Sequence, residues 1–183
     1  MTPKEAYSKY IADDSLSGLS EMLISEIMNY NPLVVLDFGA GSGKHSNCLQ
    51  EVGIETIAID VSMMNVVRAY SKYDLPTVVC SDERVLKFIK DVDLTFTCSV
   101  LDHIEDIGII IDEFKRISKT VILAETQDTP GEFYYSHDYE SYGFKKINYN
   151  YKSYPPEGDG ATYEIWIWER GQFENLNGHD DLC

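Results

Sequence analysis

Short apolar runs alternate with segments of helical periodicity through most of the chain. Each run is apolar on both faces, which is typical of a strand buried inside a parallel sheet. The segments between the runs repeat apolar residues every three or four positions, as crossover helices do. This alternation predicts an α/β fold. Strands are predicted at residues 34–38, 56–60, 76–80, 93–98 and 120–124, and helices at about 44–52, 63–73, 84–89 and 104–118.

The pattern changes after residue 124. Two further strands are predicted at residues 144–151 and 162–169, with no helix between them. The connection at 153–160 contains adjacent prolines and two glycines, which favours a hairpin with a long loop. Residues 162–169 are apolar on both faces, so we expect this strand to lie inside the sheet rather than at its edge.

The two ends of the chain differ from the middle. Residues 3–12 and 16–30 are predicted to form two short helices, and Asn31-Pro32 ends the second. We therefore expect residues 1–32 to act as a lid or packing segment before a single domain at 33–170. Residues 171–183 are polar and acidic, and we expect a disordered tail there.

Composition limits the class of substrate and indicates the cellular compartment. Asp and Glu number 31 against 15 Lys and Arg, a formal net charge of −16, which disfavours a nucleic-acid substrate. Cys48, Cys80, Cys98 and Cys183 form no C-x-x-C pair, and we expect buried free thiols that suit a reducing cytosol. With no apolar signal region and no membrane-length apolar run, a cytoplasmic protein is expected.

The most informative motif is the turn Asp37-Phe38-Gly39-Ala40-Gly41-Ser42-Gly43, between a buried strand and a helix. Ligands of open α/β sheets bind beyond the carboxyl ends of the strands, and glycines let the backbone approach them. A P-loop would need glycine where Phe38 stands and Ser or Thr where His45 stands. A dinucleotide fingerprint would need its third glycine where Lys44 stands.

The turn instead resembles motif I of the class I S-adenosylmethionine (SAM)-dependent methyltransferases, an acidic residue followed by G-x-G-x-G. Later positions strengthen the resemblance: Asp60 ends the second strand, Ser81-Asp82 follows the third, and Cys98 to Ile104 is similar to the family's segment after the fourth. In that segment Asp102 replaces the commoner Glu. The resemblance implies a three-layer α-β-α Rossmann-like fold, whose seven-stranded, mostly parallel sheet inserts an antiparallel last strand between strands five and six.

The resemblance also implies roles for single residues. Asp37 would order the glycine turn and the methionine end of SAM, Asp60 would hold the ribose, and Asp82 would hold the adenine. Ser99 would lie near the reacting methyl group, and Val61 and Ser62 would flank the adenine. The implied SAM-binding set is Asp37, Gly39, Ala40, Gly41, Asp60, Val61, Ser62, Ser81, Asp82 and Ser99.

Three histidines are candidates for chemistry, because an acceptor hydroxyl or ammonium must lose a proton and histidine titrates near neutral pH. His103 is the best candidate for a general base, against a packing role at a helix start. His137 lies in a tyrosine-rich segment that either shapes an acceptor pocket or is a surface loop. His45, on the helix after the glycine turn, either approaches the cofactor or lies at a solvated helix position, and we expect the solvated position. The histidines share no metal-ligand spacing, so no metal site is expected.

The acceptor is less constrained than the donor. The segment after the fourth strand lacks the Asn-Pro-Pro-Tyr type of motif found in nucleic-acid amino methyltransferases, and a small molecule is the leading acceptor class. Alternatives are a non-catalytic SAM-fold subunit, a methyltransferase completed by a partner or a second copy and acting on a protein, a nucleotide-dependent oxidoreductase, and SAM chemistry other than methylation.

Overall fold

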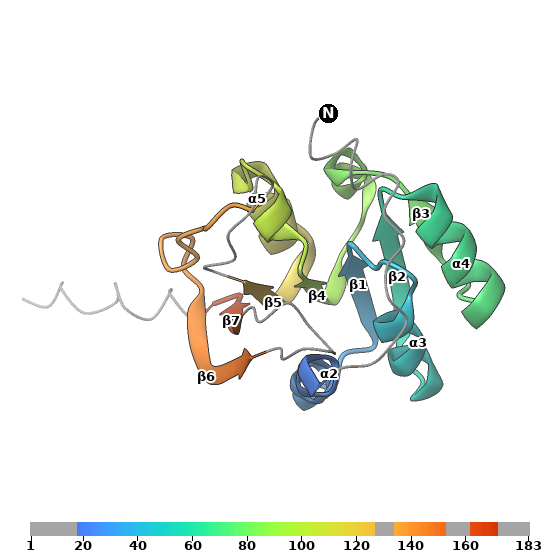
Figure 1. The fold of residues 1–183 in the computed structure, drawn as a ribbon, viewed down its shortest axis with the longest axis horizontal. Coiled ribbons are helices and arrows are strands. Elements are labelled where there is room, and N and C mark those ends of the chain that lie inside the picture. The colour runs from blue at the N-terminus through green and yellow to red at the C-terminus, as the bar shows by residue number, and fades with distance from the viewer. Residues whose placement is uncertain (1–17, 127–133, 153–161, 172–183) are drawn as a thin grey trace, which may run out of the picture.

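One sheet of seven strands lies at the centre of the molecule, in the order β3-β2-β1-β4-β5-β7-β6 (Figure 1). The computed structural model describes residues 18–126, 134–152 and 162–171. Strands β1 to β5 run parallel, and β7 runs antiparallel to both of its neighbours, β5 and β6. The strands are β1 (Val34–Phe38), β2 (Glu55–Asp60), β3 (Val78–Cys80), β4 (Val92–Cys98), β5 (Ser118–Thr126), β6 (Lys145–Lys152) and β7 (Thr162–Glu169).

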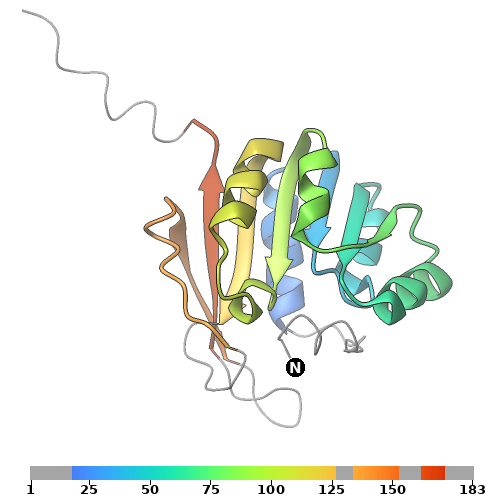
Figure 2. The ribbon, with the colours of Figure 1, turned by 90° about the horizontal axis from the view of Figure 1, so that it is seen from above.

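Helices cover both faces of the sheet (Figures 1 and 2). Side chains of α2 and α3 pack in one apolar cluster with β1, β4, β5 and β7. Side chains of α5 and the 3-10 helix η1 pack in another cluster on the opposite face, while α4 lies against β2 and β3. The predicted three-layer fold is confirmed. The helices are α2 (Gly18–Asn29), α3 (Lys44–Glu51), α4 (Met63–Tyr73), η1 (Glu83–Phe88), η2 (Leu101–His103) and α5 (Gly108–Ile117).

The strand order places a crevice beside β1. From β1 the chain moves outward through β2 to β3, and it then returns to β4 on the other side of β1. The loops that leave the carboxyl ends of β1 and β4 therefore diverge. A ligand site is expected at this reversal in an open α/β sheet.

The predicted hairpin is also confirmed. Strand β7 pairs with β5 through residues 163–169 and with β6 on its other side, so it is an interior strand. Ile165 and Ile167 pack in the cluster with α2 and α3, while Trp166 packs in the cluster with α5. Both faces of β7 are therefore buried, as its sequence predicts.

Most boundaries differ from the prediction by one or two residues, and two elements differ more clearly. The helix expected at 104–118 begins only at Gly108 as α5, because the Asp106 carboxylate accepts a hydrogen bond from the Gly108 N–H and forms a turn there, and η2 precedes this turn. The strand predicted at 120–124 extends over Ser118–Thr126 as β5, because its pairing with β7 reaches Thr126.

Other predictions need correction or fall outside the described residues. Cys80 is exposed rather than buried, because β3 is an edge strand that pairs only with β2. The helix predicted at 3–12, the loop at 153–160 and Cys183 in the predicted tail lie outside the described residues. Within the described part of the chain, no helix has the length and apolar character needed to cross a membrane.

Candidate functional site

A cavity of about 800 Å³ lies over the carboxyl ends of the central strands. Its wall is formed by the segments that follow β1, β2, β3 and β4, and residues of α2, β7 and the segment before β6 complete it. The lining includes every predicted SAM-binding residue except Asp37 and Ser62, so it brings together Gly39, Ala40, Gly41, Asp60, Val61, Ser81, Asp82 and Ser99.

The glycine turn forms one wall, and there is no room for a side chain at Gly39. Gly39 has a φ of 78°, a left-handed conformation that glycine adopts without strain. A Cβ placed on Gly39 would lie 2.2 Å from Cγ2 of Val100, so the turn after β1 touches the loop after β4. The N–H groups of Gly39 and Ala40 both donate to the carbonyl of Ile59 at the end of β2.

Asp37 lies behind this wall rather than in it. Its carboxylate is buried and accepts a hydrogen bond of 2.7 Å from the Ser46 hydroxyl on α3. Burial raises the pKa of Asp37 to about 7, against the lowering effect of Ser46. Asp37 therefore ties the end of β1 to the helix after the turn. The Asp37 side chain does not line the cavity, so it has no direct access to the methionine end of a bound SAM, where a contact was predicted.

Asp60 joins three segments at the cavity edge. Its Oδ2 accepts from the Gly41 N–H at 2.8 Å, and its Oδ1 accepts from the Ser62 N–H at 2.7 Å and from the Asn65 side-chain amide at 3.2 Å. Ser62 itself is fully buried and accepts the Asn65 N–H as the N-cap of α4. The structure thus gives Ser62 a capping role away from the cavity, whereas Val61 lines the cavity.

Asp82 follows β3 and lines the same cavity. It caps η1 by accepting the Arg84 N–H at 3.1 Å, and it pairs with the Arg84 guanidinium at 2.8 Å. The Arg84 side chain is 79% exposed, so it can move away from the carboxylate at little cost. Asp82 is therefore able to accept a hydrogen bond from a ligand.

The loop after β4 forms the wall opposite the glycine turn. Ser99 has a left-handed φ of 55°, and its hydroxyl donates to the Tyr163 hydroxyl of β7 at 3.1 Å. Asp102 and His103 follow on η2, and both line the cavity. Nε2 of His103 lies 3.5 Å from Oδ1 of Asp102, and the His103 ring packs against Tyr134 at 4.7 Å between centroids.

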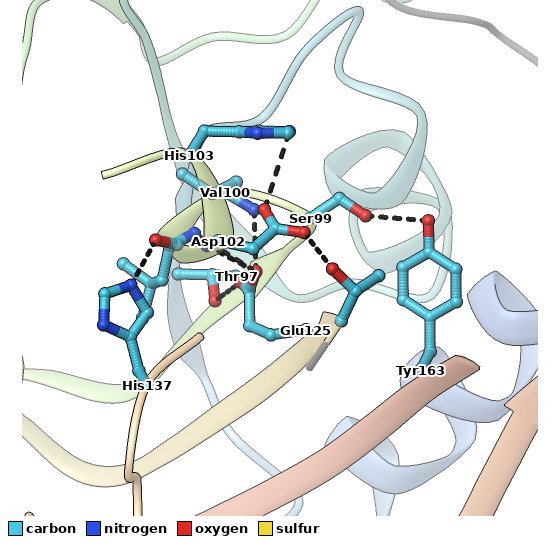
Figure 3. A network of polar contacts seen from close by, with 10 residues as sticks. Thr97, Ser99, Val100, Asp102, His103, Glu125, His137 and Tyr163 are labelled. Carbon is cyan, nitrogen blue, oxygen red and sulfur yellow. Dashed lines mark hydrogen bonds and ion pairs between the residues drawn. The ribbon is translucent and has the colours of Figure 1, made fainter. Parts of the chain in front are cut away.

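Asp102 is buried although it carries an acidic group. Burial raises its pKa, while His103 and the Thr126 hydroxyl, which donates to Oδ2 at 2.5 Å, oppose the rise. Oδ1 has no hydrogen-bond partner among the described residues and lies on the His103 side (Figure 3). The Asp102 carboxyl group, which stands where the family commonly has Glu, therefore lies beside His103.

Glu125 is a site residue that the sequence analysis missed. It is fully buried near the end of β5, and its Oε1 accepts from the Thr97 hydroxyl at 2.5 Å. Its Oε2 accepts from the N–H groups of Val100, Leu101 and Asp102 (Figure 3). Burial raises the pKa of Glu125 to about 8, and the nearby Asp102 adds to the rise. The available signal was a glutamate directly after the apolar run at 121–124, at the end of a central strand.

The structure separates the two predicted catalytic histidines. His103 lines the cavity, whereas His137 does not. Nε2 of His137 lies 2.9 Å from the Leu101 carbonyl, so it donates to the backbone of η2, and its ring packs against Tyr139. His137 therefore supports the loop from behind.

His45 corrects a further prediction. It lies at the start of α3 but is 5% exposed and lines the cavity, and its Nε2 is 2.9 Å from the Ser20 hydroxyl of α2. The expected solvated position is wrong because α2 packs over this face of α3, which the periodicity of α3 alone does not reveal. Burial lowers the pKa of His45 to about 3, with a smaller contribution from Lys44.

The burial of the His45 imidazole predicts that the stability of the folded chain depends on pH. A histidine whose folded pKa is depressed favours the unfolded chain as the pH falls below the unfolded value near 6.5. Between pH 7 and pH 5 we expect the wild type to lose about 2 kcal/mol of unfolding free energy relative to His45→Gln, which has no imidazole to protonate. Urea unfolding of both proteins at the two pH values measures the difference. An equal pH dependence in both would show that His45 is protonated in the fold.

Within the described residues, no group of three or more His, Cys, Asp or Glu side chains is arranged to hold a metal ion. The donor set fits an adenosyl group instead. Carboxylates of Asp60 and Asp82 are available for hydroxyl and amino donors, and the glycine turn lets the backbone approach a ligand closely.

Comparisons with known proteins agree with this fit. Residues 36–120 match a family model described as a methyltransferase domain. Magnesium protoporphyrin IX methyltransferase from Synechocystis PCC 6803, crystallised with bound S-adenosylhomocysteine (SAH), is similar with a TM-score of 0.66 at 16% identity, over 85% of this chain and 88% of that chain. A SAM-dependent methyltransferase from Archaeoglobus fulgidus has a TM-score of 0.59 at 17% identity, over 82% and 94%.

TehB from Haemophilus influenzae is similar with a TM-score of 0.67 at 14% identity, over 91% of this chain and 66% of that chain. No curated protein matches the sequence. The matched domain, the strand order and the composition of the cavity agree with one another. Residues 36–120 thus match a methyltransferase domain, and the described chain has the fold of the class I SAM-dependent methyltransferases, which use SAM as their cofactor.

Proposed function

We propose that this chain transfers the SAM methyl group to an oxygen or nitrogen atom of a small-molecule acceptor, leaving SAH. The observation that carries the proposal is a cavity lined by the glycine turn, by the carboxylates of Asp60 and Asp82, and by the Ser99–His103 segment. SAM supplies a methyl group on a sulfonium, so the chain's own task is mainly to position donor and acceptor.

The cofactor end of the cavity is assigned to the segments after β1, β2 and β3. Asp60 would accept from ribose hydroxyls, since its Oδ2 accepts the Gly41 N–H and a carboxylate oxygen can accept two hydrogen bonds. Asp82 would accept from the adenine amino group in place of Arg84. Asp37 would act indirectly, by holding the glycine turn to α3 through Ser46.

The acceptor end is assigned to the segment after β4 and the residues facing it. Ser99, His103, Tyr134, Tyr135 and Tyr163 line this part of the wall. These side chains offer aromatic surface and hydroxyl groups, which suit a small organic molecule. A net charge of −16 opposes a nucleic-acid acceptor.

His103 is proposed as the general base. Nε2 lies beside the carboxyl group of Asp102, which would stabilise an imidazolium formed when the acceptor loses its proton. The proton would pass from the acceptor heteroatom to the imidazole and then to solvent. Asp102 acts on His103 and is not itself required to contact the acceptor.

These assignments also suggest the roles of the chain's segments and its cellular compartment. We place SAM binding in residues 33–170 and a packing role in α2, which reaches the cavity through Leu19 and Ser20. Cys48, Cys80 and Cys98 are free thiols, which supports a reducing compartment such as the cytoplasm.

Isothermal titration with SAH tests the cofactor assignment. We expect saturable binding to one site per chain. A panel of small phenols, alcohols and primary amines, incubated with SAM and assayed for SAH formation, then tests the acceptor class. Absence of SAH binding at millimolar concentration would contradict the proposed function. Formation of methylthioadenosine instead of SAH would show that the chain catalyses a SAM reaction other than methyl transfer.

The His103→Ala substitution separates the chemical step from binding. For a hydroxyl or ammonium acceptor we expect the rate of SAH formation to fall roughly 100-fold or more, because general-base catalysis is lost, while the Kd for SAH changes little. His137→Ala is the comparison: His137 donates to the backbone of η2 without lining the cavity, so we expect a smaller fall in rate, which measures the loss of loop support alone. Near-normal turnover in His103→Ala would assign His103 a packing role.

A further inference from the structure

The carboxyl group of Glu125 lies behind the cavity wall rather than in it. Glu125 is fully buried and shares a face of β5 with Val121 and Leu123, which pack against α5. It is absent from the residues that line the cavity. Any effect of Glu125 on the reaction must therefore pass through the residues it holds.

Those residues belong to the wall opposite the glycine turn. Oε2 of Glu125 accepts hydrogen bonds from the N–H of Val100 at 2.9 Å, of Leu101 at 3.1 Å and of Asp102 at 3.4 Å. Oε1 is held by the Thr97 hydroxyl of β4. One side chain of β5 thus satisfies the backbone of a neighbouring loop, which has no strand partner at this point.

The same loop sets the geometry of the cavity. At its start, Ser99 adopts a left-handed φ and its N–H donates to the Ala124 carbonyl of β5. Next, Val100 lies against Gly39 across the crevice. At its end, His103 faces the cavity. A shift of the loop backbone would move all three residues relative to the glycine turn.

We propose that Glu125 is a positioning residue of the methyl-transfer site, which holds the backbone from Val100 to Asp102 and thereby sets where Ser99 and His103 lie. This inference rests on the proposed function. Glu125 holds the loop because Oε2 accepts its N–H groups, and a negative charge is not required. A neutral carbonyl oxygen at the same place can accept the same N–H groups.

Two substitutions of similar size distinguish the acceptor from the bulk of the side chain. Glu125→Gln keeps a carbonyl oxygen for the loop amides and an NH₂ group that the Thr97 hydroxyl can accept. Glu125→Met keeps most of the volume but offers only a weak acceptor. Leu123→Ala is the control for general destabilisation, since Leu123 lies on the same strand and face and has no polar contact with the loop.

Amide hydrogen exchange in the ligand-free protein is the first measurement. In Glu125→Met we expect exchange at Val100, Leu101 and Asp102 to be at least about tenfold faster than in wild type, because these N–H groups lose their acceptor. In Glu125→Gln we expect rates within about threefold of wild type. In Leu123→Ala these amides should change only as much as the strand amides of β5 change.

The second measurement connects the loop to the reaction. On addition of SAH, the backbone amide signals of Ser99 and His103 should shift alike in wild type and Glu125→Gln, and differently in Glu125→Met. With an acceptor from the panel above, kcat should fall at least about tenfold in Glu125→Met while the KM for SAM changes less than about threefold, with recovery in Glu125→Gln.

Several results would overturn the proposal. Equal exchange at the three loop amides in Glu125→Met and Leu123→Ala would reduce Glu125 to a packing residue. Unchanged SAH-induced shifts in Glu125→Met, or failure of Glu125→Gln to restore exchange, would also overturn it. Failure of the wild type to bind SAH would remove the proposed function but leave the ligand-free exchange result intact, so the two failures are distinguishable.

Discussion

Gly39→Ala is expected to weaken SAH binding at least about tenfold and to lower the unfolding free energy by roughly 2–5 kcal/mol. The added Cβ would lie 2.2 Å and 2.8 Å from the two γ carbons of Val100. A valine side chain is stiff at χ1 and cannot turn aside easily, so the backbone of one wall must move. Urea unfolding and titration with SAH measure the two effects separately.

Two further variants isolate the clash from backbone strain. Gly53 also has a positive φ, of 90°, but a Cβ there would meet nothing within 4 Å. Gly53→Ala should therefore cost only the conformational strain, about 1–2 kcal/mol, without affecting SAH binding. Adding Val100→Ala to Gly39→Ala should restore most of the lost affinity. If Gly39→Ala binds SAH as wild type does, the glycine turn and the loop after β4 do not form opposite walls of the cofactor site.

Asp60→Asn is expected to weaken SAH binding roughly tenfold to hundredfold, although it preserves the shape of the side chain. Both oxygens of Asp60 accept backbone N–H groups, from Gly41 on one side and Ser62 on the other. An amide NH₂ in place of either oxygen would face a donor, so Asn cannot replace Asp. We also expect a loss of about 1–3 kcal/mol of unfolding free energy from the unsatisfied group.

The control for this prediction is Asp112→Asn, which removes a carboxylate from the exposed face of α5. It should leave both stability and SAH affinity unchanged. Titration calorimetry under conditions where each variant is fully folded separates a binding loss from unfolding. Wild-type affinity in Asp60→Asn would remove Asp60 from the cofactor site.

Local patterns were sufficient to predict most of the sheet. The apolar runs at 34–38, 56–60 and 162–169 correspond closely to β1, β2 and β7, because buried strands need continuous apolar side chains. The break between η2 and α5 was not predictable in this way. It depends on the Asp106 carboxylate capturing the Gly108 N–H, and the isoleucines around it give no sign of that turn.

Site residues that belong to sequence motifs were predicted. Site residues that reach the cavity region only through tertiary contacts were missed. The glycine turn and the carboxylates after β2 and β3 occur at fixed places in the sequence, and they line the cavity. Glu125 looks like an ordinary strand-end residue until β4 and its loop are placed beside it. His45 looks solvated until α2 is placed over α3.

The buried acids have a consequence for the folded protein as a whole. Asp37 and Glu125, with pKa values of about 7 and about 8, bind protons more tightly in the fold than in the unfolded chain, where carboxyl groups titrate near pH 4. The stability they contribute is complete below about pH 4 and is lost as the pH rises through about 7 and about 8. Unfolding in neutral solution therefore releases protons, and mildly alkaline buffers draw the equilibrium towards the unfolded chain.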